Sequence, residues 1–294
     1  MTINKSMRRV LKALSFDGIE VEASRHLANL KAIDPMKIFY KTIDYKIYNG
    51  DHQIPVRIFL PGEKMEDNLP ALLFFHGGGW VTESIDNYER ICARLASATD
   101  HIVVSVEYRL APEHPYPAAV EDAMRAWDYL MYQGYGAENV TVAGDSAGGN
   151  LALVLCRRLK AAGRRMPRAL LLMSPWADMT MSGASYRERV ESDPMLTPEY
   201  IEAVRRAYAG DRDLHDPDLS PLLGDLGSFP PTLVQVGDHE ILYSDSASLA
   251  AALRAAHVPC RLEVSEGMWH VFQMFPIKKA AAAMESAARF LLEL

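Results

Sequence analysis

The sequence predicts an α/β protein built on one doubly wound sheet of eight mostly parallel strands. The first reason is a set of short apolar runs without polar alternation, which suit parallel strands covered on both faces. The second is that segments with helical periodicity separate these runs, so right-handed crossovers can join the strands within one sheet. The five apolar runs are 71–75, 102–106, 140–142, 169–173 and 232–236.

Three further strands complete the predicted sheet. Ile43–Tyr48 and Ile54–Leu60 each alternate between apolar and polar residues, as half-buried strands do. The turn residues Asn49-Gly50 lie between them and favour an antiparallel hairpin. Residues 261–265 alternate in the same way near the end of the chain. Helices are expected at 86–98, 117–133, 148–163, 245–256 and 277–294.

One stretch departs from the alternation of predicted strands and helices. Residues 178–228 contain several prolines but no strong strand, and a helix is expected to start near Glu199. Residues 1–40 have an amphipathic helical pattern. We expect both segments to form a helical cap over the carboxyl ends of the strands, the edge where open α/β sheets bind ligands. With no repeat and no low-complexity linker, the sequence predicts a single domain over residues 1–294.

Composition and charge exclude several classes of function. Apolar residues make up 49% of the chain, which is typical of a globular protein, and the net charge of −7 disfavours nucleic acid and anionic membrane as partners. Lys12 and Asp17 interrupt the apolar run that a signal peptide needs, so we expect a cytoplasmic protein. Cys92, Cys156 and Cys260 form no C-x-x-C pair, which predicts neither a metal site nor a disulfide framework.

The segment Gly144-Asp145-Ser146-Ala147-Gly148 places a G-x-S-x-G pattern between a predicted strand and a predicted helix. Glycine at both ends lets neighbouring backbone pass close to a serine on a sharp turn. The amino end of the helix would stabilise negative charge on a carbonyl oxygen bound there. A phosphate-binding glycine loop is the alternative, but the lysine of a Walker-type loop is missing. The pattern therefore predicts Ser146 as a nucleophile.

A second glycine-rich motif, His76-Gly77-Gly78-Gly79-Trp80, follows directly after the apolar run 71–75. Consecutive glycines at a strand end suit a loop whose backbone N–H groups face a ligand, as the oxyanion of acyl transfer requires. We assign Gly77 and Gly78 as oxyanion donors, with the Ala147 N–H as the third. Trp80 and Asp145 are expected to line the substrate pocket.

Together these two motifs resemble the bacterial hormone-sensitive-lipase family of α/β-hydrolases. The resemblance continues through the segments 108–113, 117–119, 193–197 and 220–222, and covers the chain from about residue 40 to its end. It implies an α/β-hydrolase fold and a capped esterase that hydrolyses short acyl esters without a metal or cofactor. It also implies a cap built from the N-terminal helices and an insertion after the sixth strand, and a homodimer as a common assembly.

The catalytic base is expected late in the chain, because the order of the triad in this fold is serine, acid, histidine. His270 lies on a loop after the final predicted strand, where the family's catalytic histidine lies. From that loop it can take the serine proton as general base and return it as general acid. His101, His215 and His257 lie away from the expected site.

Two carboxylates after the strand 232–236 could orient the base, Asp238 and Glu240. Relatives in the family often carry an Asp followed by Pro-Leu at this loop, and aligning that leucine with Leu242 places the acid at Glu240. The carboxylate need only reach the second ring nitrogen of the histidine, so the longer glutamate side chain is permitted. We predict Glu240 as the acid and keep Asp238 as the alternative.

These residues predict a serine carboxylesterase that acts through an acyl-enzyme on a small-molecule ester. An amidase or deacetylase with the same triad is an alternative, because the sequence does not reveal how the cap shapes the pocket. A non-catalytic ligand binder on a hydrolase scaffold is a second alternative. Such binders lose a member of the triad, whereas this chain keeps Ser146, Glu240 and His270.

Overall fold

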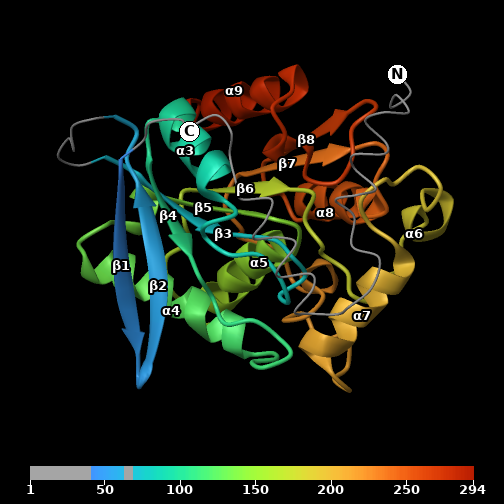
Figure 1. Cartoon of the computed structure of the whole chain (residues 1–294), viewed down its shortest axis with the longest axis horizontal. Helices are drawn as coiled ribbons and strands as arrows, with labels where there is room; N and C mark the ends of the chain where they lie inside the picture. The colour runs from blue at the N-terminus through green and yellow to red at the C-terminus, as the bar shows by residue number, and fades with distance from the viewer. Residues whose placement is uncertain (1–40, 63–68) are drawn as a thin grey trace.

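The computed structural model describes residues 41–62 and 69–294, and the predicted N-terminal cap segment 1–40 lies outside these residues. Eight strands form one sheet in the order β1-β2-β4-β3-β5-β6-β7-β8, which confirms the predicted fold class (Figure 1). Every predicted strand is present. The strands are β1 (Thr42–Asn49), β2 (His52–Phe59), β3 (Ala71–Phe75), β4 (Ile102–Val106), β5 (Val140–Asp145), β6 (Ala169–Met173), β7 (Thr232–Gly237) and β8 (Cys260–Ser265).

The sheet is parallel except at one edge. The β1–β2 hairpin is antiparallel, and β2 pairs antiparallel with β4, so that Val56 lies opposite Val106. All other neighbouring strands run parallel. In the centre, Phe75 of β3 pairs with Gly144 of β5, which brings the glycine-rich motif after β3 beside the serine turn after β5.

Helices cover both faces of the sheet (Figure 1). Consecutive residues of a strand face opposite sides, so Leu73 and Phe75 join one buried cluster, whereas Leu72 and Phe74 join the other. The first cluster includes residues of α4 (Ala118–Tyr132), α5 (Ser146–Ala161) and α8 (Tyr243–Ala255). The second includes residues of α3 (Glu89–Thr99) and α9 (Lys278–Leu292).

The insertion between β6 and β7 contains α6 (Ser185–Glu188), α7 (Pro198–Ala209) and the 3-10 turn η2 (Pro221–Leu223). Thr197 caps α7, because its Oγ1 accepts the backbone N–H of Tyr200 at 3.2 Å, and Pro198 occupies the first turn. The helix thus begins one residue before the expected Glu199. Two further 3-10 turns are η1 (Ala137–Asn139) and η3 (Phe272–Met274). Within the described residues, no helix is both long and apolar enough to cross a bilayer.

Candidate active site

Ser146 lies on a strained turn between β5 and α5. Its φ is 51°, in the left-handed region that residues other than glycine rarely adopt. The turn is closely packed, since a Cβ placed at Gly148 would lie 2.0 Å from the carbonyl oxygen of Phe75. Only glycine therefore fits at that position. The geometry matches a nucleophile elbow, in which the serine is held at the carboxyl edge of the sheet.

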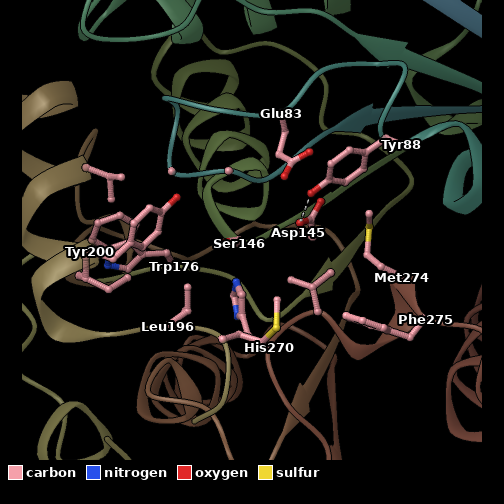
Figure 2. Close-up of a pocket in the computed structure, with 16 residues that line it drawn as sticks. Glu83, Tyr88, Asp145, Ser146, Trp176, Leu196, Tyr200, His270, Met274 and Phe275 are labelled. Atoms are coloured by element: carbon pink, nitrogen blue, oxygen red, sulfur yellow. Dashed lines mark hydrogen bonds between the residues drawn. The ribbon is translucent and has the colours of Figure 1, made fainter. Parts of the chain in front are cut away.

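His270 follows β8 and lines the same pocket as Ser146 (Figure 2). Its Nδ1 lies 2.8 Å from Oε2 of Glu240, and because a carboxylate only accepts, Nδ1–H is the donor. This bond leaves Nε2 as the ring nitrogen that can exchange a proton with a ligand. Burial works to lower the pKa of His270, but the hydrogen bond and negative charge of Glu240 outweigh it and raise the pKa above its ordinary value.

Glu240 is fully buried and is held by three donors. Its Oε1 accepts the backbone N–H of Gly237 at 2.6 Å and the hydroxyl of Ser174 at 2.9 Å, while Oε2 accepts from His270. The Ser174 Oγ also accepts the backbone N–H of Val271 at 3.2 Å, so one hydroxyl links the acid to the base loop. Ser174 did not emerge from the sequence. Its position directly after β6 is the signal that could have indicated it.

Asp238, the alternative acid, lies elsewhere. Its Oδ1 accepts the backbone N–H of Gly267 at 2.6 Å, and Nδ1 of His239 lies 2.6 Å from the same oxygen. Burial works to raise the pKa of Asp238, but the bonds from His239 and Gly267 lower it below its ordinary value. The structure thus brings Glu240 to His270, and it uses Asp238 to brace the turn that precedes the base.

The glycine-rich loop corrects one predicted donor. The Gly77 N–H donates to the Tyr88 hydroxyl at 3.1 Å, and this hydroxyl donates in turn to Oδ2 of Asp145 at 2.8 Å. Gly77 is therefore occupied within the protein, contrary to its predicted role. Gly78 and Gly79 line the pocket instead, with φ of 90° and 62°. Tyr88, eleven residues along the chain, decides which amides of the motif are free.

Ala147 lies where the sequence predicts a third donor. It is the second residue of α5, and the first N–H groups of a helix have no acceptor within it. The positive end of the helix dipole also points at this turn. Ala147 is fully buried, which keeps water from competing for this edge of the turn. Gly78 and Gly79 thus line the pocket together with Ser146, and Ala147 follows the serine directly in the chain.

Of the two predicted pocket residues, one is misplaced. Asp145 lines the pocket, as expected. Trp80 does not, because it is fully buried and stacks on Tyr208 with ring centroids 4.2 Å apart and planes 5° from parallel. Its ring also lies 5.3 Å from that of Trp176, and Trp176 is the tryptophan that lines the pocket. Trp80 therefore supports the pocket wall from behind.

The pocket has a volume of about 130 Å³ and two chemically different walls (Figure 2). One wall is mostly apolar and comes from the segment after β6 and from α7: Trp176, Leu196, Tyr200, Ile201 and Val204. Facing it is a wall that we call the acidic wall, formed by Glu83, Tyr88 and Asp145. Ser146 and His270 lie between the two walls.

Asp193 connects the insertion to the acid loop. Its Oδ1 accepts the backbone N–H groups of Met195 and Leu196 at 2.8 and 3.0 Å, and its Oδ2 accepts that of Ile241 at 2.8 Å. Burial raises the pKa of Asp193 to about 6, although these three N–H groups and the charge of His270 oppose the rise. One carboxylate thus holds the start of the apolar wall against the residue that follows Glu240. Within residues 41–62 and 69–294, no three His, Cys, Asp or Glu side chains gather to hold a metal ion.

Comparison with known proteins agrees with this fold. Residues 72–274 match a family model described as the α/β hydrolase fold. An esterase of Acinetobacter venetianus is 38% identical over 80% of this chain and 80% of its own. A solved esterase from the bacterial hormone-sensitive-lipase family is 30% identical, with a TM-score of 0.91, over 100% of this chain and 99% of that one. The chain belongs to this family of α/β-hydrolases. The resemblance predicted from the two glycine motifs is thereby confirmed.

Other relatives extend the likeness. An acetyl-hydrolase of Streptomyces hygroscopicus is 36% identical over 75% of both chains. A hyperthermophilic esterase from the archaeon Pyrobaculum calidifontis is 29% identical with a TM-score of 0.88, over 100% of this chain and 99% of its own. The same fold therefore occurs in a solved archaeal esterase.

Proposed function

We propose that this protein is a serine carboxylesterase that hydrolyses short-chain acyl esters through an acyl-enzyme. The observation that carries the proposal is the buried 2.8 Å contact between His270 Nδ1 and Glu240 Oε2, in the pocket that Ser146 lines on a strained turn. A nucleophile, a base with a free second nitrogen and a carboxylate that orients the base are the parts that acyl transfer needs.

The broader statement rests on the relatives. The chain is a carboxylic ester hydrolase, like the esterase of Acinetobacter venetianus and the Mycobacterium tuberculosis carboxylesterase, which is 34% identical over 91% of this chain. A Pseudomonas putida relative, 35% identical over 75% of this chain, is named ethyl acetate hydrolase. These names favour ester over amide hydrolysis and favour short acyl groups.

The acylation half of the reaction begins when the Ser146 Oγ attacks the ester carbonyl carbon and His270 Nε2 takes the hydroxyl proton. Glu240 holds the ring with Nδ1 protonated and stabilises the imidazolium that forms. The carbonyl oxygen becomes an oxyanion and accepts hydrogen bonds from the N–H groups of Gly78, Gly79 and Ala147. His270 then gives its proton to the leaving alcohol, and the acyl group remains on Ser146.

The deacylation half repeats these steps with water. His270 takes a proton from a water molecule, the hydroxide attacks the acyl carbon, and the same amides stabilise the second oxyanion. The proton then returns to Ser146, and the carboxylic acid leaves. Glu240 needs no proton of its own at any step, and its two oxygens accept the three hydrogen bonds that hold it beside His270.

Pocket size supports the preference for short chains. A volume of about 130 Å³ is below the roughly 300–1,000 Å³ usual for sites that take drug-sized ligands. An acetyl or butanoyl group fits such a space, whereas a long fatty acyl chain would have to displace the apolar wall. A rate profile over esters from acetate to dodecanoate should therefore fall steeply beyond the shortest acids.

The decisive test is Ser146→Ala with p-nitrophenyl acetate and butanoate. The variant should lose about 10⁶ in kcat, the cost of removing such a nucleophile elsewhere. After the wild-type reaction is quenched, mass spectrometry of the intact protein should show the added mass of one acyl group. Peptide mapping should then locate this group on a peptide that contains Ser146. Turnover retained by Ser146→Ala, or an acyl group on another residue, would overturn the mechanism. Faster cleavage of the matching anilides than of the esters would instead favour an amidase.

A further inference from the structure

Two consecutive carbonyl oxygens of the glycine-rich loop face one buried hydroxyl. Tyr108 lies two residues after β4, and its hydroxyl donates to the carbonyl oxygen of His76 at 2.6 Å and to that of Gly77 at 3.2 Å. The Tyr108 ring is 1% exposed and stacks on the imidazole of His76, with centroids 4.2 Å apart and planes 15° from parallel. Packing as well as hydrogen bonding therefore fixes the position of this hydroxyl.

The imidazole of His76 adds a second donor to the Gly77 carbonyl. Its Nδ1 lies 2.9 Å from that oxygen, and because a carbonyl only accepts, Nδ1–H is the donor. Burial lowers the pKa of His76 to about 4, so the ring is neutral near pH 7. Burial also raises the pKa of Tyr108 well above its ordinary value, which keeps the phenol protonated. Both donors to the loop carbonyls thus remain available around neutral pH.

An anchored carbonyl also sets the direction of an amide, because a trans peptide unit carries its C=O and its N–H on opposite sides. In the first unit of the loop, the His76 carbonyl meets Tyr108. Its opposite end, the Gly77 N–H, meets the hydroxyl of Tyr88, which lines the pocket (Figure 2). The next unit has its carbonyl, that of Gly77, at the same Tyr108 hydroxyl. Its N–H belongs to Gly78, which lines the pocket, whereas Tyr108 does not.

The Gly78 N–H is the amide that this arrangement leaves for a ligand. Among residues 41–62 and 69–294, it donates to no backbone carbonyl, in contrast to the N–H groups of Val81 and Thr82, which both donate to the Gly78 carbonyl. We propose that Tyr108 is a positioning residue for the oxyanion hole. By holding two loop carbonyls, its hydroxyl directs the Gly78 N–H at the oxyanion that forms when Ser146 attacks an ester. This inference rests on the proposed esterase function and adds to it a residue that does not touch the substrate.

The first test is Tyr108→Phe with p-nitrophenyl butanoate. The change keeps the ring that stacks on His76 and removes only the hydroxyl. The value of kcat should fall about 10–100-fold, a part of the 10²–10³ that follows complete loss of an oxyanion donor. KM should stay within about twofold, because the oxyanion does not exist in the bound ester. Active sites are counted by titration with diethyl p-nitrophenyl phosphate, so that misfolded molecules do not enter kcat.

A transition-state analogue separates positioning of the oxyanion hole from general damage to the pocket. The carbonyl carbon of 1,1,1-trifluoropentan-2-one bonds to the Ser146 oxygen, the serine proton passes to His270, and the carbonyl oxygen becomes an oxyanion. Pentan-2-one, in contrast, binds as a neutral ketone. In Tyr108→Phe the Ki of the trifluoroketone should rise by the factor by which kcat/KM falls, while the Ki of pentan-2-one stays unchanged. An equal rise for both ketones would contradict the positioning role.

Tyr186→Phe is the matched control. Tyr186 is also buried, and its hydroxyl also donates to a backbone carbonyl, that of Asp178 at 3.4 Å, but it does not line the pocket. This variant should keep the wild-type kcat and both inhibition constants. The rescue is Tyr108→4-aminophenylalanine, whose amino group restores a donor at the same ring position. Its kcat should return to within about threefold of the wild-type value.

Three results would overturn the role of Tyr108. They are a wild-type kcat in Tyr108→Phe, a loss of kcat without a rise in the trifluoroketone Ki, and a 4-aminophenylalanine variant as slow as the phenylalanine variant. Failure of the proposed function has a different signature, because the wild type itself would then cleave no p-nitrophenyl ester. If the wild type cleaves these esters and Tyr108→Phe cleaves them equally well, the esterase proposal stands and only the positioning role fails.

Discussion

The two sides of the serine differ in how completely their polar groups are paired. On the base side, each oxygen of Glu240 has a donor, and Ser174 ties the acid to the base loop. On the acidic wall, Asp145 keeps one oxygen without a partner among the described residues. The base side is thus fully hydrogen-bonded in the structure, whereas the acidic wall keeps one buried carboxylate oxygen without a hydrogen bond. A complete set of hydrogen bonds favours one fixed orientation of the acid, and an unmet acceptor lowers the stability of the folded state.

The largest effect is expected when the acid is removed. Glu240→Ala should lower kcat for p-nitrophenyl acetate by about 10³–10⁴, because the imidazole loses its orienting partner and its counter-charge. Asp238→Ala should cost far less, since that side chain contacts Gly267 and His239 rather than His270. Steady-state kinetics of both variants decide the matter. A greater loss in Asp238→Ala would reverse the assignment.

A smaller effect is expected in the pH dependence of the wild type. The base must be neutral to accept a proton, so kcat/KM falls as His270 becomes protonated. Glu240 raises the pKa of His270, and the acid limb should therefore lie above the ordinary histidine value of about 6.5. In Glu240→Gln the limb should move to lower pH, because burial then acts without the opposing charge. An acid limb that stays in place would mean that another group controls it.

The smallest effects, a few degrees in Tm, should have opposite signs on the two sides. The pKa of Asp145 is raised from 3.8 to about 7, so the folded state binds more protons than the unfolded state in that window. Stability contributed at this site is then lost as pH rises from about 4 to 7. Asp145→Asn should therefore raise Tm relative to wild type at pH 8 and much less at pH 4.

The matched change on the base side is Glu240→Gln. An amide offers one acceptor and adds a donor where three donors already converge on the carboxylate, so Tm should fall at pH 8. Thermal melts of both variants and the wild type at pH 4 and 8 test the pair. Changes in Tm of the same sign in both variants would contradict a difference in hydrogen bonding between the two sides.

Patterns that act over short distances were the predictable part of this molecule. Buried strands of a parallel sheet are apolar on both faces, so continuous apolar runs such as Ala71–Phe75 and Ala169–Met173 predict such strands directly. The serine turn is equally local, because Gly148 has to pass beside β3 without a side chain. The family motifs then carried the prediction from fold to site.

Errors arose where distant residues decide an orientation. The glycine motif indicates an oxyanion loop, but Tyr88 occupies the Gly77 amide and leaves Gly79 to the pocket. Trp80 is adjacent to that loop in sequence, yet stacking on Tyr208 draws it away from the pocket. Ser174 carries no local motif, and its role exists only because β6 ends beside the acid loop. Local sequence patterns cannot predict these contacts, because each one joins residues that are distant in the chain.

Asp193 limits how the insertion between β6 and β7 could be exchanged for that of a relative. Its carboxylate accepts from Met195 and Leu196 on one side and from Ile241 on the other. A graft that begins after residue 193 would keep the carboxylate but replace its partners, and one that begins before it would leave Ile241 facing a foreign side chain. A chimera should therefore take Asp193 and residues 240–241 from the same parent, although about fifty residues separate them in the sequence.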